Sequence, residues 1–239
     1  LFDFNKNYTE ILVPISWKEK INYKTKEFES DNIYSINKDS VYNLLFASSS
    51  IKLSKNTFYT DKEIEITERD NILSIDEDSI PVLKEITIKF NTDRYNDSLV
   101  NKTYIAKLEK DDKSSFVSNS LKNDNLIADI KLLGDYMIKV DSIPPSINLI
   151  DIEDSQWISN RDKLQIKIND KNSGISSYRG TLNDKWILLE YNPMKGILTY
   201  DFDDNINNSE PKNILKVNVT DNVGNTKHLE KVFFRTVKK

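Results

Sequence analysis

Two consecutive prolines, Pro144 and Pro145, follow closely on a strand-like run at residues 134–140. Tyr136, Ile138 and Val140 occupy alternate positions of that run, as expected for a strand with one apolar face. Proline has no backbone N–H to donate to a sheet, and it favours an extended conformation in the residue before it. The sequence therefore predicts that a strand ends here, that a stiff connector follows, and that the chain continues as a second unit.

Short alternating runs on both sides of the prolines predict strands almost throughout the chain. The clearest runs are residues 63–66, 85–90, 102–108, 126–130, 164–168 and 214–219. Clusters of Asn, Asp and Ser between them carry turn chemistry. Short strands at regular spacing are typical of β-sandwiches. We expect an all-β chain of tandem β-sandwiches, one over residues 31–143 and one over residues 146–239.

The beginning of the chain repeats the outline of its end. Residues 219–226, followed by a strand through Phe234, predict a hairpin whose turn contains Asn225 and Gly224. Residues 1–16 follow the same outline without the glycine. We therefore interpret residues 1–30 as a remnant hairpin of a preceding β-sandwich plus a linker, and the chain as a piece of a longer polypeptide.

Several segments resemble the tail region of a known enzyme family. Residues 156–160, 170–179, 185–191, 198–202 and 220–225 resemble an immunoglobulin-like module at the C-terminal end of secreted, Bacteroidetes-type zinc peptidases of the lysostaphin/LytM kind. Residues 133–145 resemble the way in which those tails join their modules, and residues 31–141 are similar to the ZU5-like sandwich that precedes the last module.

The resemblance implies a function as well as a fold. Those peptidases cut peptidoglycan cross-bridges, so the resemblance implies a bacterial accessory tail that positions or regulates an upstream catalytic domain. It also implies a location in the cell envelope, in the periplasm or at the outer membrane, or secretion. The partner is then the peptidase domain of the same polypeptide.

The residues that would hold zinc in that family are missing from this sequence. The family binds its metal through His-x-x-x-Asp and His-x-His motifs, whereas this chain has one histidine, His228, and no cysteine. A catalytic zinc site usually needs three protein ligands and an open position. We therefore expect no catalytic residue, no metal and no cofactor in this chain, with zinc only in an upstream domain.

The charge distribution narrows the choice of partners. The 34 Lys and Arg residues and 38 Asp and Glu residues are interspersed, for a formal net charge of −4. A nucleic-acid-binding protein needs a basic stripe that neutralises phosphates, so we expect no nucleic-acid partner. No run approaches the roughly 20 apolar residues of a membrane span, so we expect no such span.

Two acidic loops offer oxygen ligands for calcium. One contains Asp170, and the other contains Asp201, Asp203 and Asp204. The alternative is turn capping, in which each side chain accepts hydrogen bonds from nearby backbone N–H groups. Neither loop has the complete spacing of a dedicated calcium loop.

Aromatic residues of the C-terminal unit are candidate binding residues. Trp157, Trp186 and Tyr191 could stack on glycan rings, whereas a tryptophan packed between the sheets is the structural alternative. Residues 186–191 alternate in a way that makes both faces of one predicted strand largely apolar. These residues support a second hypothesis, a stand-alone glycan-binding or adhesion module with cell-wall glycan or peptide as its partner.

Overall fold

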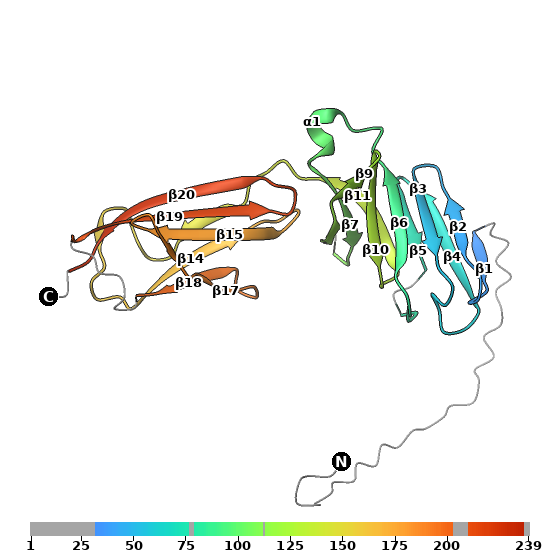
Figure 1. Cartoon of the computed structure of the whole chain (residues 1–239), viewed down its shortest axis with the longest axis horizontal. Helices are drawn as coiled ribbons and strands as arrows, with labels where there is room; N and C mark the ends of the chain where they lie inside the picture. The colour runs from blue at the N-terminus through green and yellow to red at the C-terminus, as the bar shows by residue number, and fades with distance from the viewer. Residues whose placement is uncertain (1–31, 77–78, 112, 203–209, 237–239) are drawn as a thin grey trace, which may run out of the picture. The chain divides into compact units, whose positions relative to one another are not determined.

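A computed structural model describes residues 32–76, 79–111, 113–202 and 210–236. These residues form two β-sandwiches, each of two facing sheets (Figure 1). We call residues 32–141 the N-terminal sandwich and residues 146–236 the C-terminal sandwich. The hairpin predicted at residues 1–30 lies outside the described residues.

The N-terminal sandwich contains a six-stranded and a five-stranded sheet, with antiparallel pairing. The six-stranded sheet has the order β1-β4-β5-β11-β7-β8. Its strands are β1 (Ile33–Ile36), β4 (Lys62–Arg69), β5 (Ile72–Ile75), β11 (Gly134–Val140), β7 (Thr103–Leu108) and β8 (Ser114–Ser118). The five-stranded sheet has the order β2-β3-β6-β10-β9. Its strands are β2 (Tyr42–Leu45), β3 (Ser49–Leu53), β6 (Ile86–Asn91), β10 (Asn125–Ile130) and β9 (Ser120–Lys122).

The C-terminal sandwich contains a four-stranded and a five-stranded sheet. The four-stranded sheet has the order β12-β14-β18-β17. Its strands are β12 (Ser146–Leu149), β14 (Lys163–Asn169), β18 (Ile197–Asp201) and β17 (Glu190–Asn192). The five-stranded sheet has the order β13-β20-β19-β15-β16. Its strands are β13 (Gln156–Trp157), β20 (Thr226–Phe234), β19 (Lys212–Asp221), β15 (Ile175–Leu182) and β16 (Lys185–Ile187), of which β13 and β20 run parallel.

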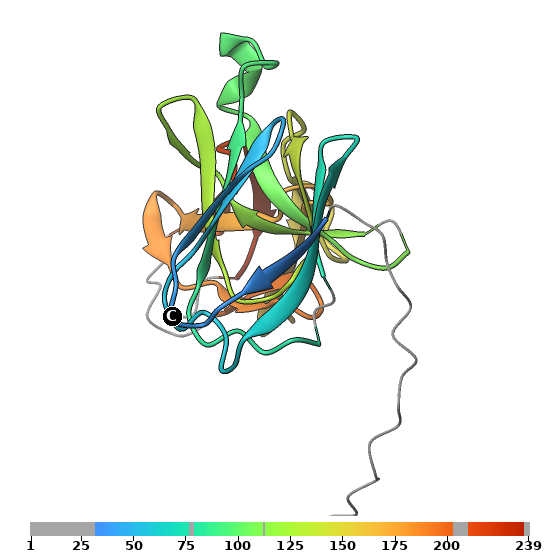
Figure 2. The same ribbon diagram turned by 90° about the vertical axis from the view of Figure 1, so that its right-hand side faces the viewer.

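Each sandwich buries its own core because its strands alternate inward apolar and outward polar residues. In β14, for example, Leu164, Ile166 and Ile168 are buried and the four residues between and beside them are exposed. The N-terminal core is built largely from isoleucine and leucine together with Phe58, Phe90 and Tyr136. The one helix of the described residues, α1 (Asp97–Val100), lies beyond the ends of the strands (Figures 1 and 2).

The structure confirms the predicted all-β fold of tandem sandwiches. All six alternating runs coincide with strands, and β11 ends at Val140, before Pro144 and Pro145. The predicted hairpin is formed by β19 and β20, which pair as far as Thr220 and Thr226.

One local prediction is wrong, because residues 186–191 do not form a single strand. Residues 185–187 belong to β16 of the five-stranded sheet, and residues 190–192 belong to β17 of the four-stranded sheet. The chain therefore crosses from one sheet to the other near Leu188 and Leu189. Leu189 is buried and Leu188 is exposed, so the crossing still contributes one side chain to the core.

Candidate functional site

The two sandwiches meet at the connector that follows β11, and Asp141 is its first residue. Asp141 is fully buried, with no exposed surface. Its backbone N–H donates to Lys102 O of the N-terminal sandwich at 2.9 Å. Its carbonyl accepts from Asn225 Nδ2 of the C-terminal sandwich, also at 2.9 Å. The backbone of Asp141 is therefore bonded to both sandwiches.

The side chain of Asp141 accepts four hydrogen bonds. Oδ1 accepts from Ile143 N at 3.0 Å and Asn172 Nδ2 at 3.1 Å. Oδ2 accepts from Ser173 N at 3.1 Å and Ser173 Oγ at 2.6 Å. Three of these donors belong to the loop after β14, in the other sandwich. A carboxylate is a stronger acceptor than a neutral group, so this loop is held firmly to the connector.

Two further aspartates stand beside Asp141. Asp170 Oδ1 accepts from Asn172 N at 3.0 Å and from Gly174 N at 2.8 Å. Asp221 accepts from Val223 N, Asn225 N and Asn225 Nδ2. One carboxylate oxygen from each of the three aspartates lies within 4.8 Å of the others. The β14–β15 loop and the β19–β20 turn are thus both shaped by side-chain caps and converge on Asp141.

The pKa values of Asp141, in the connector, and Asp170, in the β14–β15 loop, are shifted in opposite directions. Burial raises the pKa of Asp141, but the hydrogen bonds from Ser173, Ile143 and Asn172 outweigh it, and the pKa lies below its ordinary value. Burial also raises the pKa of Asp170, and repulsion from Asp141 and Asp221 adds to this. Its two backbone hydrogen bonds do not compensate, so the pKa of Asp170 lies above its ordinary value. Asp141 is thus favoured as an anion, whereas the charge on Asp170 is disfavoured.

Three carboxylates this close have the chemistry of a hard-cation site, since calcium binds six to eight oxygens. Most of their oxygens already accept hydrogen bonds from the chain, which accounts for the arrangement without an ion. The capping interpretation of Asp170 therefore has direct geometric support. Of the other calcium candidates, Asp201 is half-exposed and pairs with Lys163 at 3.1 Å, while Asp203 and Asp204 lie outside the described residues.

A small apolar cluster also joins the two sandwiches. Tyr104 and Ala106 of β7, with Phe116 of β8, pack against Val223 of the β19–β20 turn. The rings of Tyr104 and Phe116 lie 5.6 Å apart. Burial, with repulsion from the aspartates Asp141 and Asp170, raises the pKa of Tyr104 to about 12. The junction therefore combines a small dry contact with the polar network, a combination that restrains the two sandwiches.

Two further hydrogen bonds join the sandwiches at the same turn. Lys102 Nζ donates to Val223 O at 3.2 Å, and Asn119 Nδ2 donates to Asn222 O at 2.5 Å. Both acceptors are backbone carbonyls of the β19–β20 turn. The turn predicted from Asn and Gly residues is therefore a docking element for the preceding sandwich as well as a reversal of the chain.

The predicted aromatic binding residues do not form one platform. Trp157 is 57% exposed on β13, where it stacks on Phe234 at 5.3 Å between ring centres. Trp186 is 61% exposed on β16, at the opposite edge of the same sheet. Tyr191 lies on β17 of the other sheet, with its ring 5.5 Å from that of Tyr178. Neither Trp157 nor Trp186 fills the sandwich core, so the structural alternative considered for these two residues is wrong.

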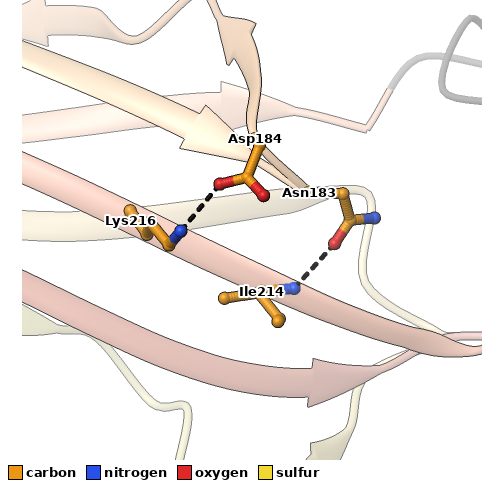
Figure 3. A network of polar contacts seen from close by, with 4 residues as sticks. All are labelled: Asn183, Asp184, Ile214 and Lys216. Carbon is orange, nitrogen blue, oxygen red and sulfur yellow. Dashed lines mark hydrogen bonds and ion pairs between the residues drawn. The ribbon is translucent and has the colours of Figure 1, made fainter.

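The turn beside Trp186 is held by polar contacts (Figure 3). Asn183 Oδ1 accepts from Ile214 N at 2.8 Å, and Lys216 Nζ donates to Asp184 Oδ1 at 2.7 Å. The hydrogen bond to Asp184, with its charge, raises the pKa of Lys216. Asn183 and Asp184 both adopt positive φ, as a two-residue hairpin turn requires. These contacts fix the β15–β16 hairpin and thereby the position of Trp186.

His228, the one histidine of the sequence, is exposed on β20. Its Nδ1 lies 2.6 Å from Asn218 Oδ1 on the neighbouring strand. A strand-surface imidazole with an amide partner on the neighbouring strand is a structural arrangement.

The sequence alone did not identify Asp141 and Asp221 as members of one site. They are 80 positions apart in the chain, and only the fold brings their loops together. The available signals were an aspartate three residues before a double proline and an aspartate opening the turn Asp221–Asn225. The first signal predicts the end of a strand and the start of a connector, and the second predicts a hairpin turn; neither indicates that the two aspartates meet.

The disfavoured charge on Asp170 should destabilise the folded chain at neutral pH. We expect Asp170→Asn to raise the free energy of unfolding at pH 7 by up to about 0.5 kcal/mol, a small gain because the site is partly exposed. The amide oxygen can still accept from Asn172 N and Gly174 N. A raised pKa lowers stability as pH rises through it, so the gain should vanish below the ordinary pKa of about 4. Urea unfolding of both proteins at pH 7 and pH 3.5 measures it. A variant that is less stable at pH 7 would show that the charge on Asp170 is not disfavoured in the folded chain.

Comparison with known protein families identifies the N-terminal sandwich. Residues 31–141 match the family model of the Zu5-like domain. No curated protein matches the chain. The described part of the chain contains no helix with the length and apolar character needed to cross a membrane.

Proposed function

We propose that this chain is a non-catalytic accessory tail of a zinc peptidase that acts on peptidoglycan. In this proposal the tandem sandwiches hold the catalytic domain of the same polypeptide in a fixed relation to its substrate, in the cell envelope or outside the cell. The single observation that carries the proposal is the junction. A fully buried aspartate, bonded to both sandwiches, is an unusual connection between modules whose relative motion would otherwise be expected.

A restrained junction suits a positioning role better than a catalytic one. Peptidoglycan is an extended polymer, and a rigid tail fixes the distance and angle at which a neighbouring domain meets it. Pro144 and Pro145 support this role because they stiffen the connector directly after Asp141. The composition agrees with it, since one histidine and no cysteine leave too few ligands for a zinc centre of this type.

The coding sequence that precedes Leu1 tests the proposal directly. We expect it to encode a domain with His-x-x-x-Asp and His-x-His motifs. The longer polypeptide should then release peptides from purified peptidoglycan in a zinc-dependent reaction. Removal of residues 31–239 should change the rate or the pattern of cleavage without abolishing hydrolysis of a small soluble substrate. A preceding sequence without these motifs would overturn the proposal.

The exposed tryptophans favour a second candidate function, a glycan-binding or adhesion module. Trp157 and Trp186 both present more than half of their surface to solvent, and exposed indole rings stack on sugar rings. Sedimentation of the chain with purified peptidoglycan, lost on Trp186→Ala but not on Tyr59→Ala, which removes an equally exposed aromatic ring from the N-terminal sandwich, would favour this candidate. Equal sedimentation of both variants would count against it.

A further inference from the structure

A cleft of about 310 Å³ opens in the C-terminal sandwich beside the junction. Its walls come from two places, the end of β14 with the following loop, and the β17–β18 hairpin. The hairpin is tied to β14 by a hydrogen bond from Ile168 N to Gly196 O at 2.9 Å and by another from Lys167 Nζ to Lys195 O. A cleft of this volume is at the small end of the range for ligand pockets.

One wall of the cleft carries the carboxylate of Asp170, which can accept further hydrogen bonds. Asp170 contributes to the lining, and its Oδ1 is occupied by the N–H groups of Asn172 and Gly174. Its Oδ2 has no protein partner among the residues that the structure describes. One carboxylate oxygen of Asp170 lies within 4.8 Å of an oxygen of Asp141 and an oxygen of Asp221. A cationic group at this position would therefore be attracted by three aspartates, one of which offers a vacant oxygen.

The other walls carry cations and apolar surface. Lys167 and Lys195 both line the cleft and are exposed. Tyr191 and Met194 line it as well; Met194 is 97% exposed, and Tyr191 is held against Tyr178. An almost fully exposed methionine beside a fixed aromatic ring is an adaptable apolar contact. The cleft thus presents one carboxylate, two lysine ammonium groups and an apolar wall within one small volume.

From this arrangement we infer that the cleft binds short peptides that carry both a free ammonium and a free carboxylate. The ammonium lies against Asp170, the carboxylate lies against Lys195 or Lys167, and the aliphatic part of the peptide lies on Tyr191 and Met194. Stem peptides of peptidoglycan have this chemistry; naming them as the occupant rests on the proposed function, whereas the ligand class does not.

The test is a titration of the full chain, labelled with ¹⁵N, with alanyl-γ-glutamyl-diaminopimelate, followed by NMR. We expect millimolar binding with shifts at Asp170, Tyr191 and Lys195. Asp170→Asn should weaken binding roughly three- to tenfold, as expected for one partly exposed charge contact. Asp184→Asn, which removes a carboxylate from the other sheet, is the matched control and should leave the affinity unchanged.

Modified peptides separate the two charged contacts. Acetylation of every amine should weaken binding to the wild-type chain, and Asp170→Asn should then have no further effect. Amidation of the carboxylates should likewise weaken binding to the wild-type chain, and Lys195→Gln should then have no further effect. If acetylated and free peptides bind alike, or if Asp170→Asn and Asp184→Asn behave alike, the inference is wrong.

A second probe distinguishes the ligand class from the proposed function. The tripeptide Asp-Glu-Lys has the same charged groups, two ammonium groups and three carboxylates, but does not occur in peptidoglycan stems. Binding of both peptides supports the ligand class alone, and preference for the diaminopimelate peptide supports the cell-wall assignment too. Absence of shifts with both peptides at 10 mM, a concentration of about ten times a millimolar Kd, would overturn the inference and leave the proposed positioning role untouched.

Discussion

Replacement of Asp141 by alanine is expected to lower the free energy of unfolding by about 3 kcal/mol. The carboxylate accepts from Ile143 N, Asn172 Nδ2 and both donors of Ser173, and Ser173 is itself fully buried. Alanine would leave these donors without an acceptor, and the two donors of Ser173 are buried away from water. A buried donor without a partner is destabilising by its full desolvation penalty. Urea unfolding, followed by the fluorescence of Trp157 and Trp186, measures the change.

The matched control is Asp184→Asn in the C-terminal sandwich, because asparagine tolerates the positive φ of this turn position. Asp184 is 81% exposed and pairs with Lys216 on the surface, so the loss of its charge should change stability by less than about 0.5 kcal/mol. NMR relaxation adds a readout of the junction, because the two sandwiches should tumble together in the wild-type chain and separately in Asp141→Ala. A stability change below about 1 kcal/mol, with unchanged tumbling, would show that the junction does not depend on Asp141.

The strands could be predicted from the sequence because their signal is local. Alternation of apolar and polar residues follows from the geometry of one strand, and runs such as residues 164–168 keep it without interruption. The end of β11 was equally predictable, since Pro144 and Pro145 exclude ladder hydrogen bonds wherever they occur. These features can be predicted without knowing which strands pair with one another.

The arrangement of the candidate sites depends on strand order, which the alternation does not encode. Trp157 and Trp186 lie on opposite edges of one sheet because three strands separate β13 from β16. Tyr191, only five positions after Trp186, belongs to the other sheet because the chain crosses over at Leu188 and Leu189. The cleft has the same origin: Asp170 and Lys195 become neighbours only through the pairing of β14 with β18.

Substitution of Gly196 by alanine is expected to lower the free energy of unfolding by about 3 kcal/mol, for two separable reasons. Gly196 has a φ of +61°, which side-chain-bearing residues adopt at a penalty of about 1 kcal/mol. A Cβ at this position would also lie 2.7 Å from Ile168 O. That oxygen belongs to the backbone of β14 and cannot rotate away, so the strand or the hairpin must shift, at about 2 kcal/mol more.

Gly224→Ala separates the two contributions. Gly224 also has a positive φ, of +82°, but a Cβ there would meet no atom within 4 Å. Gly224→Ala should therefore lower the free energy of unfolding only by the conformational penalty, about 1 kcal/mol. Urea unfolding measures both variants, and the difference between their losses reports the clash with Ile168 O. Equal losses would mean that β14 and the hairpin yield freely at this point. The β17–β18 hairpin would then be an adjustable wall of the cleft, whereas the expected large difference makes it a rigid one.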